Sequence, residues 1–585
     1  MERTLNSEQR TPNVQRKRPV RGVGLVAFVL LATQAIARPP SAPIPGVVRQ
    51  TNNVYLVENH SSAGMIWYRS GRRGLTVVHL DAHDDCRYVP PETIGKLDQL
   101  RKARAWDEIF RLSDLSTVSG FKVRPKETLF DLGNFIYPCM ADGTVSRFIW
   151  VVPDLSMDDT SRARLKGHLG SALRLATPEF TDHEDGSFSF PLLKGTMVVT
   201  SLNAMSALPP GAILDLDVDF FAFPRALTDI HLEGDMQWAP ESVCGRLAEM
   251  VPDPALTTIS ASVYGGYLPL MFRFLADACF DRLASGSYPA YARRHLDTVL
   301  AMRRTASPVP LPPAPTDAVY EPAYQHLAGL LKLIERKPTE AFTHMERAAS
   351  LSPVYRKAWL DSAEALRYMG DLEAAQESIR RFEHDMGHAT TGSRTEQVHL
   401  LRLLDRFDEA EGMARELADW NPDPHLLLLH GGVLAQMQRY DEASEVYHRV
   451  LAIHPQDYLA AYNLAYVHDQ QGKTAEAITY YRATVALRDD FAAAHENLGF
   501  LLMRKKAFTG AEVHLRRALE INPNKATAWG NLGSVLLETD RPEDAVPCFR
   551  KALELAPDLA KVHEGLAVAL EASARATARE TPPRR

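Results

Sequence analysis

The C-terminal part of the chain repeats with a period of 34 residues. Pro455, Asp489, Pro523 and Pro557 follow one another at this spacing, and small or apolar residues recur at fixed offsets before them. A repeat of this length folds as one pair of helices, which buries its apolar face only by stacking on the next pair. The period therefore predicts an array of helix pairs instead of a single globular core.

Two well-preserved copies show which positions define the repeat. One copy contains Trp529, Leu532, Gly533, Leu536, Ala545, Phe549, Ala552 and Pro557. The copy before it contains His495, Leu498, Gly499, Leu502, Ala511, Leu515, Ala518 and Pro523. Small residues such as Gly533 and Ala545 let the two helices of a pair cross closely. The pattern resembles the tetratricopeptide repeat (TPR), which implies an all-α superhelix that binds extended peptides or protein surfaces.

The predicted repeat domain extends over residues 322–570. We expect seven repeats and a partial one, which begin near residues 322, 356, 391, 424, 458, 492, 526 and 560. The polar residues 571–585 are expected to form a disordered tail. Before the repeats, residues 306–315 contain five prolines. Since proline neither continues a helix nor donates to a sheet, residues 306–321 are predicted to be a semi-rigid, Pro-rich linker.

The N-terminus has the pattern of a secretory signal. Basic residues up to Arg21 precede residues 22–37, an uncharged apolar run that ends in Ala35-Ile36-Ala37. This run is shorter than the ~20 residues that span a bilayer, so a signal peptide cut after Ala37 is predicted. An uncleaved signal anchor is the alternative. Either reading places the chain outside the cytoplasm, secreted or periplasmic.

Composition excludes several classes of function. The net charge of −7 and the lack of basic clusters in the rest of the chain argue against a nucleic-acid binder. The five cysteines show no Cys-x-x-Cys spacing, so neither a zinc ribbon nor a thioredoxin-like site is indicated.

Residues 38–305 are predicted to form an α/β domain. Short β-branched runs at residues 75–80, 148–152, 197–200, 212–218 and 257–260 are strand candidates, and residues 92–112 and 268–283 have helical periodicity. Several of these strands are apolar almost throughout, which is typical of a mostly parallel sheet buried on both faces.

Two acidic clusters come at the ends of two of these strands. Asp81, His83 and Asp85 follow one strand at alternate positions, and Asp215, Asp217 and Asp219 end another. Alternate residues of a strand share a face, ~7 Å apart, so these like charges repel one another unless protons or a cation intervene. Carboxylates with imidazole suit Mn²⁺, Fe²⁺ or Zn²⁺. The simpler alternative is that two acidic turns end the strands.

The clusters resemble known metal-binding motifs. Asp81-Ala82-His83-Asp84-Asp85 matches the DAHxD motif of the arginase/ureohydrolase superfamily. Residues 217–221 resemble its DxDxxDP motif, with Ala222 in place of the last aspartate. The chain resembles even more closely a poorly characterised arginase-like domain family. Its members pair an ENH element, here Glu58-Asn59-His60, with HxDxHxD and DLDxDFF segments. The resemblance covers residues 52–275 and implies a three-layer, arginase-like fold.

The resemblance also implies a ligand set for two metal ions, Mn²⁺ first, with Zn²⁺ or Fe²⁺ as alternatives. One ion would be held by His60, Asp81, Asp85 and Asp217. The other would be held by Asp81, His83, Asp217 and Asp219. The register leaves Asp215 and Asp217 as an alternative pair. His79, on the same strand face as Asp81, is either a partner that supports a ligand or a packed core histidine, and the packed histidine is favoured.

A catalytic role is implied for Tyr267. In deacetylase-like relatives a tyrosine of a Gly-rich loop stabilises the oxyanion, and Val263-Tyr264-Gly265-Gly266-Tyr267 falls in that region. A packed aromatic in a turn is the alternative. The arginase histidine that shuttles protons and the glutamate that binds the guanidinium have no counterpart here. The implied activity is metal-assisted hydrolysis of an amide, acyl-amine or guanidine-like small molecule.

Two hypotheses follow. The chain is an exported metallohydrolase that acts on C–N bonds other than peptide bonds and carries a TPR module for a protein or peptide partner. Alternatively, it is a non-enzymatic TPR scaffold with an inactive arginase-like domain.

Overall fold

The computed structural model describes residues 44–580, except for several short gaps. The gaps are residues 83–84, 114–127, 130–133, 154–156, 176–178, 206–207, 209, 222–237, 262–268 and 306. The chain divides into the units 1–43 and 44–585, and all described residues belong to the second. The predicted signal peptide, His83 and Tyr267 therefore lie outside the described residues.

In the N-terminal half of the second unit, the described residues form a mixed nine-stranded sheet with the order β1-β2-β9-β8-β3-β4-β7-β6-β5. The strands are β1 (Val47–Thr51), β2 (Val54–Val57), β3 (Leu75–Leu80), β4 (Val145–Val152), β5 (Thr181–Asp182), β6 (Phe188–Leu192), β7 (Gly195–Ser201), β8 (Ile213–Asp217) and β9 (Leu256–Ser260). The central run from β2 to β7 is parallel, while β1, β5 and β6 pair antiparallel at the edges. All the predicted strands are confirmed.

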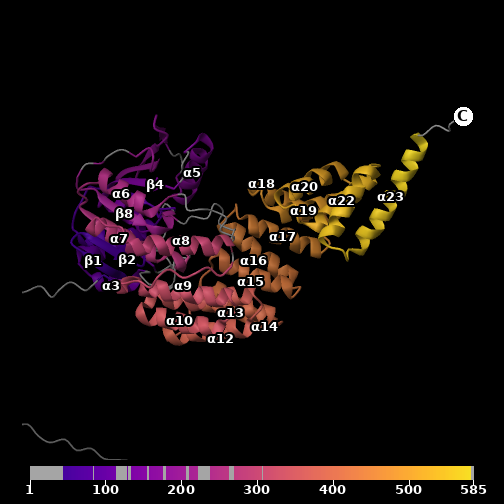
Figure 1. Cartoon of the computed structure of the whole chain (residues 1–585). Coiled ribbons are helices and arrows are strands. Elements are labelled where there is room, and N and C mark those ends of the chain that lie inside the picture. Colours follow the sequence, from indigo (N-terminus) through magenta and orange to yellow (C-terminus); the bar gives the residue numbers. More distant parts are fainter. Residues whose placement is uncertain are drawn as a thin grey trace, which may run out of the picture. The chain divides into compact units, whose positions relative to one another are not determined.

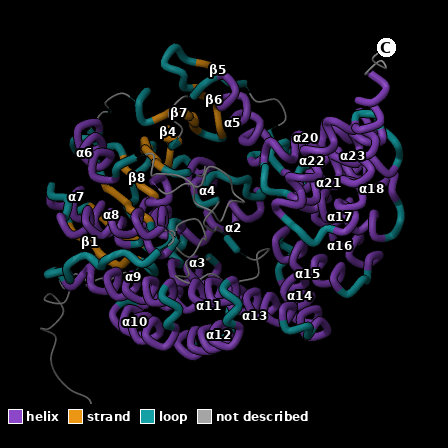
Figure 2. The backbone as a smooth tube through the Cα atoms, turned by 45° about the vertical axis from the view of Figure 1, so that its right-hand side comes forward, coloured by secondary structure: helices purple, strands orange, loops and turns teal. Residues whose placement is uncertain are grey.

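Helices cover both faces of this sheet (Figure 2). They are α1 (Ser61–Arg69), α2 (Pro91–Lys102), α3 (Trp106–Leu112), α4 (Ile136–Asp142), α5 (Asp159–Ala172), α6 (Pro240–Met250), α7 (Phe274–Ser285) and α8 (Ala290–Thr305). Alternate strand residues divide between two apolar cores: Leu214 and Leu216 pack with α6, α7 and α8, and Ile213 and Trp150 pack with α1, α4 and α5. The helix predicted over residues 92–112 is interrupted after α2, where Arg104 adopts a φ of 55°.

The C-terminal half is an array of antiparallel helix pairs, coloured from pink through orange to yellow in Figure 1. The helices are α9 (Glu321–Ile334), α10 (Pro338–Leu351), α11 (Ala358–Tyr368), α12 (Leu372–Met386), α13 (Thr391–Leu403), α14 (Phe407–Trp420), α15 (Pro424–Gln436), α16 (Tyr440–Ile453), α17 (Tyr458–Gln470), α18 (Thr474–Leu487), α19 (Ala492–Arg504), α20 (Phe508–Ile521), α21 (Ala526–Glu538), α22 (Pro542–Leu555) and α23 (Ala560–Glu580). From α13 onward, the first helix of each pair begins at the predicted residue. The all-helical repeat architecture is confirmed.

The two ends of the repeat domain differ from the prediction. The tail expected to be disordered from residue 571 continues α23 through Glu580, because this stretch is rich in alanine, the strongest helix former. The predicted linker forms no regular structure over residues 307–317, but it then folds against α7: Tyr320 is buried, and its hydroxyl donates to Asp281 at 2.7 Å. Among the described helices, none is both long and apolar enough to cross a membrane.

Two adjacent glycines of α15 offer a test of the close helix crossing. A Cβ added at Gly431 would lie 2.5 Å from the buried ring of Tyr447 in α16, whereas one at Gly432 would meet nothing within 4 Å. Gly431→Ala is therefore expected to lower the free energy of unfolding by about 1–3 kcal/mol through overpacking. Gly432→Ala is expected to raise it by up to about 1 kcal/mol through helix propensity. Urea unfolding followed by circular dichroism measures the free energy of unfolding of both variants. Equal changes in the two variants would contradict the close crossing of α15 and α16 at Gly431.

Candidate metal centre

The acidic clusters meet where the strand order of the sheet reverses. Asp81 directly follows β3, and Asp217 is the last residue of β8. These strands are parallel neighbours, with His79 opposite Asp215 and Leu80 opposite Leu216. The chain continues from β3 to β4 on the other side, so β3 and β8 border a topological switch point. In open α/β sheets, ligands bind beyond the carboxyl ends of strands at such points.

His60 reaches this point from the loop after β2. It immediately precedes α1, and the side chain of Asn59 accepts a hydrogen bond from the N–H of Ser61 at 2.9 Å, which fixes the start of the helix. The ring of His60 lies against that of Phe135, with centroids 5.0 Å apart. Phe135 in turn packs on Gly64, where an added Cβ would lie 2.8 Å from its ring. This tight packing of α1 determines the position of the His60 ring.

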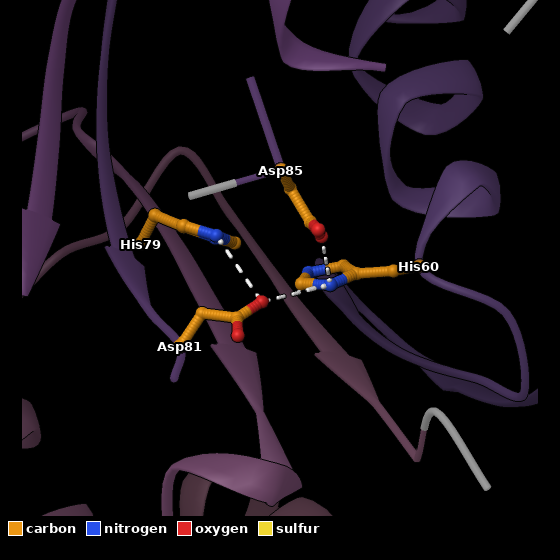
Figure 3. Close-up of side chains that lie close together, drawn as sticks. All are labelled: His60, His79, Asp81 and Asp85. Atoms are coloured by element: carbon orange, nitrogen blue, oxygen red, sulfur yellow. Dashed lines mark ion pairs between the residues drawn. The ribbon is translucent and has the colours of Figure 1, made fainter. Parts of the chain in front are cut away.

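Three carboxylates converge on one ring nitrogen of His60. Its Nδ1 lies 2.8 Å from Oδ2 of Asp85, 3.0 Å from Oδ2 of Asp217 and 3.3 Å from Oδ2 of Asp81. Figure 3 shows Asp81 and Asp85 directed toward this ring. All four side chains are buried, yet Nδ1 has no partner in hydrogen-bond geometry among the described residues. Such a buried polar atom needs a cation or a proton among the carboxylates.

The described ligand candidates form two groups that share Asp81. Atoms of His60, His79, Asp81 and Asp85 all lie within 4.8 Å of one another, and so do atoms of Asp81, Asp217 and Asp219. The sequence left two alternative pairs of ligands in the second cluster. Asp217 and Asp219 lie beside Asp81, whereas Asp215 contacts the rings of His60 and His79. The metal role of these residues stays a prediction. His83 and the proposed catalytic Tyr267 lie outside the described residues.

Backbone contacts orient the carboxylates. Oδ1 of Asp217 accepts the N–H of Asp219 at 3.1 Å, and Oδ1 of Asp219 accepts the N–H of Ala82 at 3.3 Å. Asp85 adopts a φ of 44°, a left-handed conformation in which aspartate is among the less unfavourable residues. This turn brings the Asp85 carboxylate back toward His60.

Sequence reasoning did not predict the contact between His79 and Asp215. Nδ1 of His79 lies 2.8 Å from Oδ2 of Asp215, and Nε2 of His60 lies 3.0 Å from the same oxygen. The hydroxyl of Thr258 donates to the other oxygen of Asp215. His79 is thus a hydrogen-bonded partner of the site as well as a buried residue. One sequence signal pointed to this contact: His79 and Asp215 each stand two residues before a ligand candidate, on the same strand face.

The cluster perturbs the ionisation of its members. Burial lowers the pKa of His60, but the charges of Asp215 and Asp217 outweigh burial and raise this pKa well above its ordinary value. Burial also lowers the pKa of His79, but the hydrogen bonds and charges of Asp215 and Asp81 outweigh burial and raise this pKa to about 10. Burial and then Asp81 raise the pKa of Asp85 to about 6. Without a cation, the carboxylates therefore hold protons on the imidazole rings.

Glu58 anchors the loop that carries His60. Its carboxylate accepts hydrogen bonds from Nε of Arg273 at 3.0 and 3.1 Å, and both side chains are buried. The guanidinium also donates to Asp277 at 2.7 Å. In the ENH element, Glu58 thus has a structural role, Asn59 accepts a hydrogen bond from the first N–H of α1, and His60 faces the carboxylates. This donor set of imidazole and carboxylate oxygens fits Mn²⁺, Fe²⁺ or Zn²⁺.

Comparisons with known proteins concern the repeats. Family models of the tetratricopeptide repeat match residues 489–558 and 428–490. Among solved structures, pilF of Pseudomonas aeruginosa is 16% identical over 36% of this chain and 96% of its own, with a TM-score of 0.33. A tetratricopeptide repeat protein from Parabacteroides merdae is 16% identical over 43% and 99%, with a TM-score of 0.34. No curated protein matches the chain. The C-terminal region of this chain therefore contains tetratricopeptide repeats.

Proposed function

We propose that residues 38–305 form an arginase-like domain with a binuclear metal centre, which hydrolyses a C–N bond other than a peptide bond. The observation that carries this proposal is the buried Nδ1 of His60, which has three carboxylate oxygens within 3.3 Å and no hydrogen bond among the described residues. Leaving such a cluster without a cation is costly, because buried like charges repel one another and lose their hydration.

The resemblance to the ureohydrolases assigns the ligands. His60, Asp81, Asp85 and Asp217 would hold one ion, and Asp81, His83, Asp217 and Asp219 the other. The described members of both sets come together in the fold, and Asp81 belongs to both of the groups found there. That sharing supports two ion positions, both of which Asp81 would help to hold. Mn²⁺ is the first choice of metal, with Zn²⁺ or Fe²⁺ as alternatives.

The residues of the chain would orient and polarise the substrate. Bound metal ions supply Lewis acidity and lower the pKa of water toward neutrality. The N–H groups of Ala82 and Asp219 hold the carboxylates of Asp219 and Asp217 in fixed orientations. Tyr267 is proposed to donate a hydrogen bond to the oxygen on which negative charge develops. The substrate is proposed to be an amide, an acyl-amine or a guanidine-like small molecule.

The TPR repeats provide the second part of the proposed function. Repeats of this kind present surfaces for proteins or peptides. One TPR protein, YrrB, is described as having an unusual peptide-binding site; it is 19% identical over 31% of this chain and 91% of its own, with a TM-score of 0.26. We propose that the chain is exported to the periplasm or secreted, and that the repeats bring the hydrolase to a protein partner.

An activity panel tests the hydrolase proposal. The full chain, stripped of metal and reloaded with Mn²⁺ or Zn²⁺, is expected to hydrolyse one of the three substrate classes. Chelation is expected to abolish turnover, and Asp217→Asn is expected to reduce it by at least about a hundredfold, since a ligand is lost. Phe500→Ala, a change on an exposed residue of the repeats, serves as the control that keeps activity. Metal-loaded protein that is inactive on all three classes would contradict the proposal and favour the non-enzymatic scaffold.

A further inference from the structure

One carboxylate oxygen lies between the two buried histidines of the site. Oδ2 of Asp215 is 3.0 Å from Nε2 of His60 and 2.8 Å from Nδ1 of His79. The hydroxyl of Thr258, from the neighbouring strand β9, donates to Oδ1. Asp215, His79 and Thr258 are all fully buried. Both oxygens of Asp215 are thus engaged, and β9 holds the side chain in one orientation.

This contact determines which ring nitrogens face the metal ligands. An ionised carboxylate only accepts hydrogen bonds, so the two nitrogens that face Asp215 carry the protons. The remaining nitrogens, Nδ1 of His60 and Nε2 of His79, each lie 3.3 Å from Oδ2 of Asp81. Neither has a partner in hydrogen-bond geometry among the described residues. Asp215 therefore directs one nitrogen of each histidine toward the same ligand candidate.

We propose that Asp215 is the positioning residue of the metal centre: by accepting Nε2–H of His60 and Nδ1–H of His79, it fixes both rings with their other nitrogens toward Asp81. This inference rests on the proposed metal centre. Hydrogen bonds from a ligating histidine to a carboxylate fix its tautomer and orientation, and their loss typically weakens metal binding by about 10–100-fold. Here a single carboxylate serves two histidines, one a proposed ligand and the other a support for Asp81.

A role in packing alone explains this arrangement poorly. Ile213, two residues before Asp215 on the same face of β8, packs in the apolar core of that face and shows that an apolar side chain is well accommodated there. A buried carboxylate costs desolvation that an apolar residue would avoid. The ring of His79 also lies 5.2 Å from that of Phe148, in surroundings that would suit an aromatic residue. The polar pair therefore points to a task beyond filling space.

A Co²⁺ titration of the full chain tests the inference. Metal-stripped wild type and Asp215→Asn are titrated with Co²⁺, and the visible absorption of the bound ion gives both affinity and coordination geometry. Asparagine keeps the shape but removes the charge, so Asp215→Asn is expected to bind Co²⁺ about 10–100-fold more weakly, with shifted bands at saturation. Asp142→Asn is the matched control, because Asp142 is a poorly exposed carboxylate that pairs with Arg73 and Arg101 away from the site.

The outcomes separate this inference from the proposed function. If wild type binds Co²⁺ and Asp215→Asn binds it with the same affinity and spectrum, Asp215 has no positioning role, while the metal centre remains. If Asp142→Asn weakens binding as much as Asp215→Asn, the effect reflects general destabilisation and the inference fails. If wild type binds no Co²⁺, the proposed metal centre itself is wrong. Circular dichroism at the titration temperature shows that each variant is folded.

Discussion

Replacing Arg273 with methionine is expected to destabilise the sheet around β2 and α7 by about 3–5 kcal/mol, because the buried carboxylate of Glu58 would lose its partner. Arg273 is 3% exposed and Glu58 4% exposed. Amide hydrogen exchange measures the local opening of β2 without assuming that the whole chain unfolds in one step. Exchange of these amides is expected to accelerate on the order of a hundred- to five-thousandfold. Because Glu58 stands two residues before His60, metal binding should weaken as well.

An exposed ion pair of the same chemistry provides the control. Arg293 contacts both oxygens of Glu241, but its side chain is 50% exposed. Arg293→Met is therefore expected to change local stability by no more than about 1 kcal/mol. Replacing Glu58 and Arg273 together by apolar residues should cost less than Arg273→Met alone, since no unpaired charge remains. Similar exchange in Arg273→Met and Arg293→Met would show that the Glu58 pair does not stabilise the loop of His60.

Substitutions of the proposed ligands are expected to remove metal ions one at a time. Asp85 is assigned to one ion, so Asp85→Asn should leave about one ion per chain. Asp81 and Asp217 are assigned to both, so the double variant Asp81→Asn, Asp217→Asn should bind none. Metal analysis after equilibrium dialysis counts the ions. The poorly exposed carboxylate Asp142 again serves as the control, and Asp142→Asn should keep the wild-type count.

The pattern of losses can contradict this assignment. If Asp85→Asn removes both ions or neither, Asp85 is not the ligand of a single position. If the double variant keeps its metal while circular dichroism shows it to be folded, Asp81 and Asp217 are not bridging ligands. The site would then have to be built from other residues.

Much of the fold could be predicted from the sequence because its signals are local. The small residues Gly533 and Ala545 indicate that the two helices of one repeat cross closely. The apolar runs at β3 and β8 report strands buried on both faces. Asp81 and Asp217 could be predicted to lie close together because each ends a parallel strand.

Contacts between residues far apart in the chain could not be predicted in this way. Glu58 and Arg273 are separated by 215 positions, and His79 and Asp215 by 136. No local period records such a pairing, because it depends on which strands and helices become neighbours in the sheet. The helix through Glu580 differs from the predicted disordered tail for another reason: residues 571–580 are mostly polar, but they also contain several alanines, which favour a helix.

The metal content of the wild-type chain tests the central claim most directly. The full chain is stripped of metal, dialysed to equilibrium against Mn²⁺ and, separately, Zn²⁺, and analysed by inductively coupled plasma mass spectrometry. The proposed centre predicts about two ions per chain for at least one of these metals. A wild-type chain that is folded yet retains no more metal than the double variant Asp81→Asn, Asp217→Asn would contradict a metal centre at the ends of β3 and β8.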